Sequence, residues 1–415
     1  EIVNIMIYYT ALRGAFQRKK MYNRLMKAHK THWLICAALV AALALIAQFS
    51  SCASDASSKG TEVVLDPAYY TDLFTYDNAD TLLGRGINLG NYFEAPKTAS
   101  HPLSEGEWTG GRKAQASDFT IMAQAGFKTV RIPVRWSDHA DKTAPYTINP
   151  AFLARVQEVI QQARTAGLVV VLNVHHYEQM MNNPSSALAG HKERLSAIWD
   201  QLSQEFPISA YGRDELIFEL LNEPNGTVGY DDWNNIIENL TTIIWSQHSA
   251  TQTGRRIMVG TANWGGVPGL KRLQLPSACT KDNTIITVHY YEPFQFTHQG
   301  AEWTSGAKAW IGTTWTGKDE EKTPLLSLLD SIVEWNAQSN RGFEIFMGEF
   351  GVYTKHARAD HQKAWTAFIA REAERRKMSW AYWEYSSGFG AWNPETGTWR
   401  EQLFDALIPR EDRPN

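Results

Sequence analysis

Cysteine is scarce in this sequence of 415 residues. The three cysteines are Cys36, Cys52 and Cys279, and only Cys279 lies beyond residue 60. A single thiol cannot form an internal disulfide bond, so the body of the chain must be stable without one. About 355 residues lie beyond residue 60, and a chain of that length can bury a large apolar core.

Positive charge is also scarce in the body of the chain. Residues 1–51 hold seven of the 40 basic residues and one of the 44 acidic residues, which leaves 33 basic and 43 acidic residues afterwards. The body therefore has a net charge of −10. A nucleic-acid partner would require a basic face for its phosphates, so this balance argues against nucleic-acid binding.

The sequence has no apolar run long enough to cross a bilayer comfortably. A basic stretch from Arg24 to Lys30 precedes an apolar run from Trp33 to Ala47, and about fifteen apolar residues fit the central part of a signal peptide. The order Phe49-Ser50-Ser51-Cys52 resembles a bacterial lipoprotein cleavage box, with Phe49 where Leu is usual. We expect export with a lipid on Cys52; an ordinary signal peptidase site nearby is the alternative.

Two parts follow from this interpretation. Residues 1–60 are interpreted as translated upstream sequence, a signal peptide and a short linker, with Met21 or Met26 as the start. Residues 61–415 are interpreted as one domain. We expect the protein to be secreted, at the cell surface or in the periplasm. If Cys52 is lipidated, we expect an outer-membrane lipoprotein.

Eight short β-rich runs recur along the body, and amphipathic helical patterns lie between them. In residues 149–166 the apolar side chains repeat with a helical period, and Asn149-Pro150 provides the start. Further helical patterns lie near 192–206, 231–248, 324–337 and 359–376. The eight runs are Gly84–Leu89, Thr129–Val134, Leu168–Val174, Leu216–Leu221, Arg256–Gly260, Thr284–Val288, Glu344–Met347 and Ser379–Trp383.

This alternation predicts an α/β fold with parallel strands buried on both faces. Eight units without a linker favour a single (β/α)8 TIM barrel over an open doubly wound sheet. No glycine-rich dinucleotide or phosphate fingerprint follows the first run, which also disfavours the open sheet. Chemistry in such a barrel lies at the carboxyl ends of the strands.

Two glutamates stand at the ends of predicted strands. Glu223 follows the fourth run in Leu221-Asn222-Glu223-Pro224, and Glu349 follows the seventh in Met347-Gly348-Glu349-Phe350-Gly351. Hydrolysis of a glycosidic bond requires two carboxyl groups, one that protonates the leaving oxygen and one that attacks the anomeric carbon. The pair therefore predicts a glycosidase.

An ordered set of residues resembles glycoside hydrolase family 5 over roughly residues 82–405. Within that family, residues 85–91 and 298–303 look like those of bacterial endoglucanases. The resemblance implies a retaining barrel with its acid on strand four and its nucleophile on strand seven. The set is Arg131, His175, Asn222-Glu223-Pro224, His289-Tyr290-Tyr291, Glu349 and Trp383.

The resemblance assigns the two central roles. Glu223 would be the general acid/base and Glu349 the nucleophile, with their carboxyl groups about 5–5.5 Å apart for retention. The charge of ionised Glu349 is expected to keep Glu223 protonated until Glu349 is esterified. Arg131 would hold Glu349 ionised and oriented, and Tyr291 would donate a hydrogen bond to it. A structural ion pair is the alternative role of Arg131.

The remaining site residues would bind or support the sugar. Asn222 would bind the sugar 2-hydroxyl, and His289 would lie close to the acid/base. His175 matches the family histidine after strand three, whereas His176 is expected to face the other way. Trp383 would form the platform beneath the sugar, unless it is a core residue. Asn91 and Glu94 are candidates for sugar contacts, and further platform candidates are Trp136, Trp264, Phe294, Trp303 and Trp392.

The leading hypothesis is a retaining endo-β-1,4-glucanase acting on cellulose or related β-glucans, monomeric and without a cofactor. A mannanase, a xyloglucanase or a mixed-linkage glucanase on the same barrel is the alternative. A metallohydrolase is a third hypothesis, because the histidines and glutamates could form a metal-binding site. Residues 88–91, Asn-Leu-Gly-Asn, stand where metal-dependent barrels commonly carry His-x-His, which disfavours a metal. A non-catalytic glycan-binding lipoprotein is the remote alternative.

Overall fold

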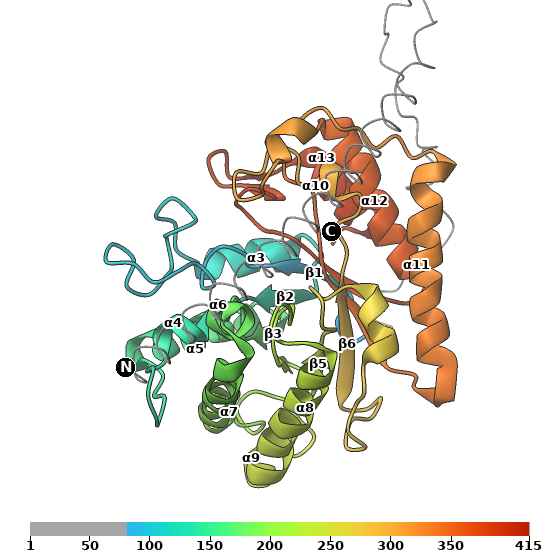
Figure 1. Cartoon of the computed structure of the whole chain (residues 1–415). Coiled ribbons are helices and arrows are strands. Elements are labelled where there is room, and N and C mark those ends of the chain that lie inside the picture. The colour runs from blue at the N-terminus through green and yellow to red at the C-terminus, as the bar shows by residue number, and fades with distance from the viewer. Residues whose placement is uncertain (1–80, 415) are drawn as a thin grey trace, which may run out of the picture. The chain divides into compact units, whose positions relative to one another are not determined.

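A computed structural model describes residues 81–414, and these form a closed barrel of eight parallel strands in sequential order, β1 to β8 (Figure 1). The expected (β/α)8 barrel is confirmed. A two-stranded antiparallel sheet, β9 (Trp392–Asn393) and β10 (Thr398–Trp399), follows the barrel. The barrel strands are β1 (Arg85–Asn88), β2 (Thr129–Ile132), β3 (Val169–Asn173), β4 (Leu216–Glu219), β5 (Ile257–Val259), β6 (Thr284–His289), β7 (Glu344–Phe350) and β8 (Ser379–Tyr382).

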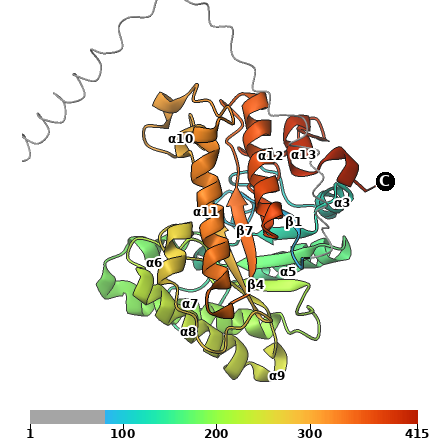
Figure 2. The same cartoon turned by 90° about the vertical axis from the view of Figure 1, so that its right-hand side faces the viewer.

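Helices surround the strands, and Figure 2 shows α11 and α12 standing on the outside of the barrel beside β7. The longer helices are α3 (Ala116–Gln124), α5 (Pro150–Thr165), α7 (Leu188–Glu205), α8 (Tyr230–Thr241), α11 (Asp319–Ala337), α12 (Ala359–Arg375) and α13 (Glu401–Leu407). Single-turn helices are α4 (Trp136–His139), α6 (Glu178–Asn182), α9 (Ser249–Gln252) and α10 (Phe294–Thr297).

Local sequence explains where α5 begins. The side chain of Asn149 accepts a hydrogen bond from the backbone N–H of Phe152, and Pro150 takes the first helical position. Pro lacks an N–H and has a helical φ, so it suits a position whose N–H would have no partner. The buried side chains of α5, among them Val156 and Ile160, form the stripe that packs on the barrel.

The eight predicted strands and five predicted helices are all present. One difference matters for the site, because β7 continues past Met347 to Phe350 and therefore contains Glu349. The helices α3 and α13 were not predicted from the sequence. They have nine and seven residues, too short to show a full apolar stripe.

The barrel interior changes from apolar to polar toward the carboxyl ends of the strands. At the other end it is filled by a cluster that comprises Leu83, Val171, Ile217, Met258, Ile285, Phe346 and Ala381. Nearer the mouth, Asn88 of β1 pairs in register with Arg131 of β2, and Asn173 of β3 with Glu219 of β4. All four of these polar side chains are almost fully buried. This polar layer is the base of the candidate site.

The predicted signal peptide and the lipidation of Cys52 lie outside the described residues and stay predictions. In the described part of the chain, every helix is too short or too polar to cross a membrane. Cys279 is a buried free thiol, and burial raises its pKa to about 11.

Candidate active site

The barrel brings the two candidate glutamates together at its mouth. The side chain of Glu349, near the end of β7, is 7% exposed, whereas the side chain of Glu223 is 24% exposed. Glu223 follows β4 with a positive φ of 44°, a conformation that turns the chain sharply away from the strand. One oxygen of each carboxylate and a ring nitrogen of His289 all lie within 4.8 Å of one another.

Both oxygens of Glu349 are held by hydrogen bonds. Arg131 Nη1 donates to Oε1 at 2.7 Å, and the hydroxyl of Tyr291 donates to Oε2 at 2.9 Å. Burial, together with the nearby carboxylates, raises the pKa of Tyr291 well above its usual value, so the phenol keeps its proton and remains a donor. These contacts agree with the roles that the family resemblance implied for Arg131 and Tyr291.

Arg131 is fully buried and has partners on every side. Its Nη1 also donates to Asn88 Oδ1 at 2.9 Å, and its Nη2 donates to Asn222 Oδ1 at 2.7 Å. Glu219 accepts from Nε at 2.6 Å and from Nη2 at 2.8 Å. Burial alone would lower the pKa of Arg131, but the carboxylates of Glu219 and Glu349 outweigh it and raise that pKa. Arg131 is therefore a permanent cation that fixes Asn222 and Glu349.

Glu219 is a functional residue that the sequence analysis missed. It is 1% exposed and binds the guanidinium of Arg131 through two oxygens, which sets the direction of the other N–H groups. A buried charge is costly unless it is paired, so an acid at the end of the apolar β4 was a signal for such a partner. Glu219 acts on the site through Arg131 and is a positioning residue.

Replacing Glu219 with glutamine should lower both stability and turnover. The variant leaves Arg131 in place but removes one of its two buried counter-charges, and breaking a buried ion pair costs about 3–5 kcal/mol. Chemical denaturation would measure the free energy of unfolding, and substrate turnover would report the misaligned Arg131.

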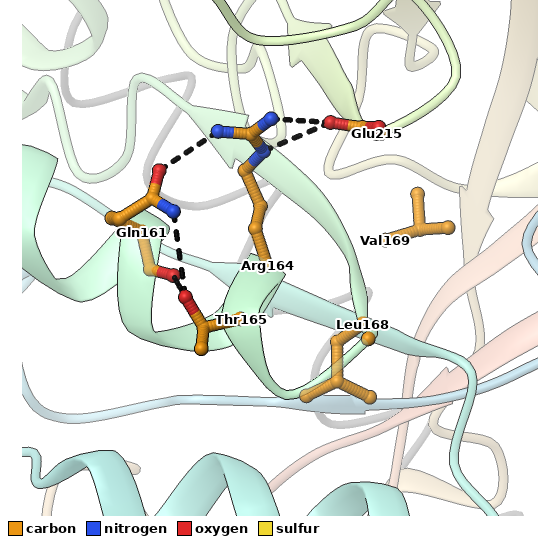
Figure 3. A pocket seen from close by; sticks show the side chains of 7 residues that line it. Gln161, Arg164, Thr165, Leu168, Val169 and Glu215 are labelled. Carbon is orange, nitrogen blue, oxygen red and sulfur yellow. Dashed lines mark hydrogen bonds and ion pairs between the residues drawn. The ribbon is translucent and has the colours of Figure 1, made fainter.

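The matched control for this variant is Glu215→Gln at the opposite end of the same strand. Glu215 pairs with Arg164 beside a cavity of about 300 Å³ near the start of β3 (Figure 3), and its side chain is 58% exposed. An exposed pair contributes about 0–1 kcal/mol, so this control should stay close to the parent. Equal stability losses in the two variants would contradict the role assigned to Glu219.

His289 links the two glutamates. Its Nδ1 lies 2.7 Å from Glu223 Oε1 and 3.6 Å from Glu349 Oε2. Burial favours the neutral ring, but Glu349 and Glu223 together outweigh it, so the pKa of His289 is raised. Gly348 allows the ring to come this close, because a Cβ there would lie 2.5 Å from Thr287 Oγ1 and 3.1 Å from His289 Nε2.

Trp383, which follows β8, stacks on His175, which follows β3. The ring centroids are 5.8 Å apart and the planes 10° apart, and His175 is almost fully buried. Trp383 is only partly buried, as a platform residue must be, and a Cβ at Gly90 would lie 3.1 Å from its ring. Burial lowers the pKa of His175 well below its usual value, so its ring is neutral and accepts a hydrogen bond from Asn173 Nδ2 at 3.1 Å.

His176 was expected to face away from His175, but in the structure the two side chains lie together. The two rings meet edge to face with centroids 4.4 Å apart. The expectation assumed strand alternation, but the strand has ended and His176 has a φ of +47°, which turns its side chain toward the same rim. Burial lowers the pKa of His176 to about 3, so this ring is also neutral.

The other aromatic candidates divide into core and surface residues. Trp136 is fully buried, packs on Phe152 and donates its indole N–H to the carbonyl of Asn173, so its assignment as a platform was wrong. Trp392 is also a core residue, 9% exposed and packed on Tyr385 and Trp399. Trp264 and Trp303 are each 60% exposed, and Phe294 stacks on His298 with centroids 3.9 Å apart.

Glu94 and Asn91 lie in the loop after β1. Glu94 is fully buried; its Oε1 accepts a hydrogen bond from the backbone N–H of Asn91, and its Oε2 has no partner among the described residues. Burial raises the pKa of Glu94 to about 8. Near neutral pH this carboxyl therefore has a proton to donate. Glu384, which the sequence analysis missed, is similarly buried beside Trp383, and burial raises its pKa to about 7.

The stability of the protein should depend on Glu94 in a pH-dependent way. An unperturbed Glu ionises near 4.5, whereas folded Glu94 holds its proton up to a pKa of about 8. Between these values the unfolded state binds fewer protons than the folded state, so stability falls as the pH rises. Glu94→Gln removes this loss, at about 1.4 kcal/mol per unit of pKa shift. The fall in the free energy of unfolding between pH 4.5 and pH 8 should therefore be smaller in the variant than in the parent, with the fall due to Glu384 remaining; an equal fall in the two proteins would contradict the buried neutral acid.

The two glutamates and His289 also resemble a set of metal ligands. Glu223, His289 and Glu349 present ligand atoms close enough for one ion. These atoms already have partners, because His289 Nδ1 bonds to Glu223 and both oxygens of Glu349 accept hydrogen bonds from other residues. The geometry therefore fits a hydrogen-bonded acid–nucleophile pair.

Comparison with known proteins decides the family. A family model described as cellulase, glycosyl hydrolase family 5, matches residues 90–388, which contain both glutamates and all the residues that hold them. The chain belongs to glycoside hydrolase family 5. It is a glycoside hydrolase.

The family 5 relatives include several endoglucanases. Endoglucanase B of Ruminococcus albus is 30% identical over 372 residues, which cover 85% of this chain and 84% of that protein. Endoglucanase H of Acetivibrio thermocellus is 30% identical over 334 residues, 79% of this chain. This chain spans about a third of that longer protein, 33%.

Solved structures of family 5 have the same barrel. The endoglucanase Cel5A of the hyperthermophile Thermotoga maritima is 42% identical, with a TM-score of 0.70 over 79% of this chain and 97% of that chain. Other structures of Cel5A contain mannotriose and cellobiose.

Proposed function

We propose that this protein is a retaining endo-β-1,4-glucanase, with Glu349 as the nucleophile and Glu223 as the general acid/base. The observation that carries the proposal is that an oxygen of Glu223 lies within 4.8 Å of an oxygen of Glu349. Retaining glycosidases place their carboxyl groups about 5–5.5 Å apart, whereas inverting enzymes need about 6.5–9.5 Å to admit a water molecule.

The first step forms a glycosyl–enzyme ester. Glu349 attacks the anomeric carbon while the bond from that carbon to the leaving oxygen breaks, and Glu223 transfers its proton to that oxygen. The hydrogen bonds from Arg131 and Tyr291 hold the carboxylate in one orientation, so little reorganisation is needed as it attacks.

The second step hydrolyses the ester. Glu223, now ionised, removes a proton from water as the water oxygen attacks the anomeric carbon, and the bond from that carbon to Glu349 breaks. Two inversions at one carbon restore the β configuration. His289, which bonds to Glu223, is placed to keep this carboxyl directed at the leaving oxygen and then at the water.

Aromatic side chains and the relatives support the substrate class. The partly exposed indole of Trp383 and the exposed indoles of Trp264 and Trp303 suit the apolar C–H faces of sugar rings. The similar proteins are named endoglucanases, which supports a β-glucan substrate and internal cleavage. A β-mannan is the second candidate, because Cel5A of Thermotoga maritima has also been solved with mannotriose.

Two measurements on purified protein test the proposal. Proton NMR of the first products on cellopentaose should show the β anomer before mutarotation; an α anomer would overturn retention. Viscosity on carboxymethyl cellulose, barley β-glucan, glucomannan, galactomannan and xylan should fall fastest on the β-glucans, with Glu349→Gln as the inactive control. A fall confined to galactomannan would keep the mechanism and replace the substrate.

A further inference from the structure

Asn173 is a fully buried amide at the end of β3 that the proposed mechanism does not use. Its Oδ1 accepts a hydrogen bond from the backbone N–H of Val134 at 3.1 Å, and its Nδ2 lies 3.1 Å from Nδ1 of His175. A backbone N–H can only donate, so the contact with Val134 fixes which end of the amide is the oxygen. The NH2 end of Asn173 therefore faces His175.

Backbone and ring contacts hold this amide and the imidazole of His175 in place. The backbone N–H of His175 donates to the carbonyl of Val134 at 2.8 Å, so Val134 binds Asn173 with its N–H and His175 with its carbonyl. The indole N–H of Trp136 donates to the backbone carbonyl of Asn173 at 2.9 Å, and stacking on Trp383 fixes the plane of the imidazole. The two side chains therefore face each other in one geometry.

The amide decides which ring nitrogen of His175 has the proton. Because an NH2 group donates, Nδ1 of His175 must accept, and the single proton of the neutral ring lies on Nε2. The other neutral tautomer would place an N–H on Nδ1 directly against an N–H of Asn173. The imidazolium ion would do the same, so Asn173 opposes both of these forms.

The surroundings of His175 also oppose the imidazolium ion. Burial and nearby positive charge lower the pKa of His175 well below its usual value. The groups that contribute this charge are His176, Arg131, His289 and Arg135. In glycoside hydrolysis positive charge develops on the sugar in the transition state, and a second cation beside the sugar would repel it. A neutral ring that still donates a hydrogen bond avoids this repulsion.

Nε2 of His175 is available to a ligand. It has no hydrogen-bond partner among residues 81–414, and it is not sealed from solvent, although the residue is only 2% exposed. His175 follows β3 at the same barrel mouth as Glu349 and stacks on Trp383. A sugar at this mouth can therefore accept a hydrogen bond from the Nε2–H group.

We propose that Asn173 is a positioning residue that fixes the Nε2–H tautomer of His175, so that this ring donates a hydrogen bond to a sugar hydroxyl at any working pH. Asn173 touches no substrate and acts only through His175. The part played in catalysis rests on the proposed function, whereas the tautomer does not.

¹⁵N NMR of the full chain with labelled histidine tests the tautomer without a substrate. We expect the signals of His175 to show a protonated Nε2 and an unprotonated Nδ1, unchanged between pH 5 and pH 8, where an ordinary histidine titrates. His175→Gln identifies these signals by removing them. A proton on Nδ1, or a titration within this range, would overturn the proposal whatever the variants show.

Asn173→Asp should reverse the arrangement. The carboxylate can still accept from the N–H of Val134, but it cannot donate to His175, so a proton should move onto Nδ1. The carboxylate also raises the pKa of His175, so the ring is a cation at low pH and lacks its Nε2 proton at high pH. In both forms kcat/KM on nitrophenyl β-cellobioside should fall roughly tenfold to hundredfold.

The matched control is Asn183→Asp. Asn183 follows α6, and its Nδ2 lies 3.0 Å from Nε2 of His191 in α7, outside the residues that hold the two glutamates. This variant makes the same change of charge beside a histidine. It should alter the signals of His191 and leave kcat/KM close to that of the parent.

The outcomes separate this inference from the proposed function. A parent that cleaves no aryl cellobioside while Nε2 has the proton would overturn the proposed function and the donor role of His175, but not the tautomer. If Asn173→Asp moves the proton to Nδ1 and keeps the parent kcat/KM, the donor role is wrong. A loss of kcat/KM while Nε2 still has the only ring proton would also overturn the proposal, since Asn173 would then act by another route.

Discussion

Glu349→Gln should abolish turnover while leaving the fold intact. The amide has almost the shape of the carboxylate and can keep contacts with Arg131 and Tyr291, but it is uncharged and a poor nucleophile. Loss of a nucleophile that acts as a unit with its neighbours lowers kcat by about 10⁴-fold or more. Reducing ends released from barley β-glucan would measure this loss, and the circular dichroism spectrum would show that the fold is kept even though Arg131 has lost one counter-charge and the thermal midpoint falls.

Glu349→Gly with added azide makes this prediction sharper. A small anion can enter the space left by the missing carboxylate and attack the anomeric carbon from the same side of the sugar. With an aryl β-celloside, the expected product is the α-cellosyl azide, formed by a single inversion. A β azide, or near-native hydrolysis by Glu349→Gln, would show that Glu349 is not the nucleophile.

The barrel could be predicted from the sequence because its strands are buried on both faces. Such strands read as continuous apolar runs, and the runs at 169–173 and 284–289 have no competing interpretation as amphipathic helices. The proximity of the two glutamates was also predictable, because the barrel fixes the mouth as the place where strand ends meet. The positions of Glu223 and Glu349 at the ends of predicted strands were enough to infer that they lie near each other.

The surroundings of the pair could not be predicted in the same way. Glu219 is the last residue of β4, and its importance depends on Arg131 reaching it from β2. The pKa of Glu94 near 8 depends on complete burial, which its loop sequence does not reveal. Both properties arise from contacts between segments far apart in the chain.

The tryptophans show most clearly that burial could not be predicted from the sequence. Trp136 and Trp108 both lie in segments that follow barrel strands, yet the first is fully buried and the second is 41% exposed. Trp136 was a platform candidate from the sequence, and Trp108 was not. An indole fits a core and a sugar equally well, so its residue type does not distinguish the two roles.

Glu223→Gln should damage polysaccharide hydrolysis far more than the first step on an activated substrate. A sugar alkoxide is a poor leaving group and needs the proton of Glu223, so loss of general acid catalysis should lower kcat on β-glucan by about 10²–10⁴-fold. A dinitrophenolate needs almost no proton, so formation of the glycosyl–enzyme ester from dinitrophenyl cellobioside should stay near the parent rate. The second step still lacks its base, and the ester should accumulate.

Pre-steady-state kinetics would observe this as a burst of dinitrophenolate equal to the enzyme concentration, followed by slow turnover. Azide should restore turnover, because an anionic nucleophile attacks the ester without a general base, and the product should be the β-cellosyl azide. The opposite configurations of the azide products from the Glu223 and Glu349 variants identify the two roles independently. The contribution of a general acid grows with the basicity of the leaving group. Equal rate losses on β-glucan and dinitrophenyl cellobioside, with no burst, would therefore place Glu223 among the residues that bind the sugar.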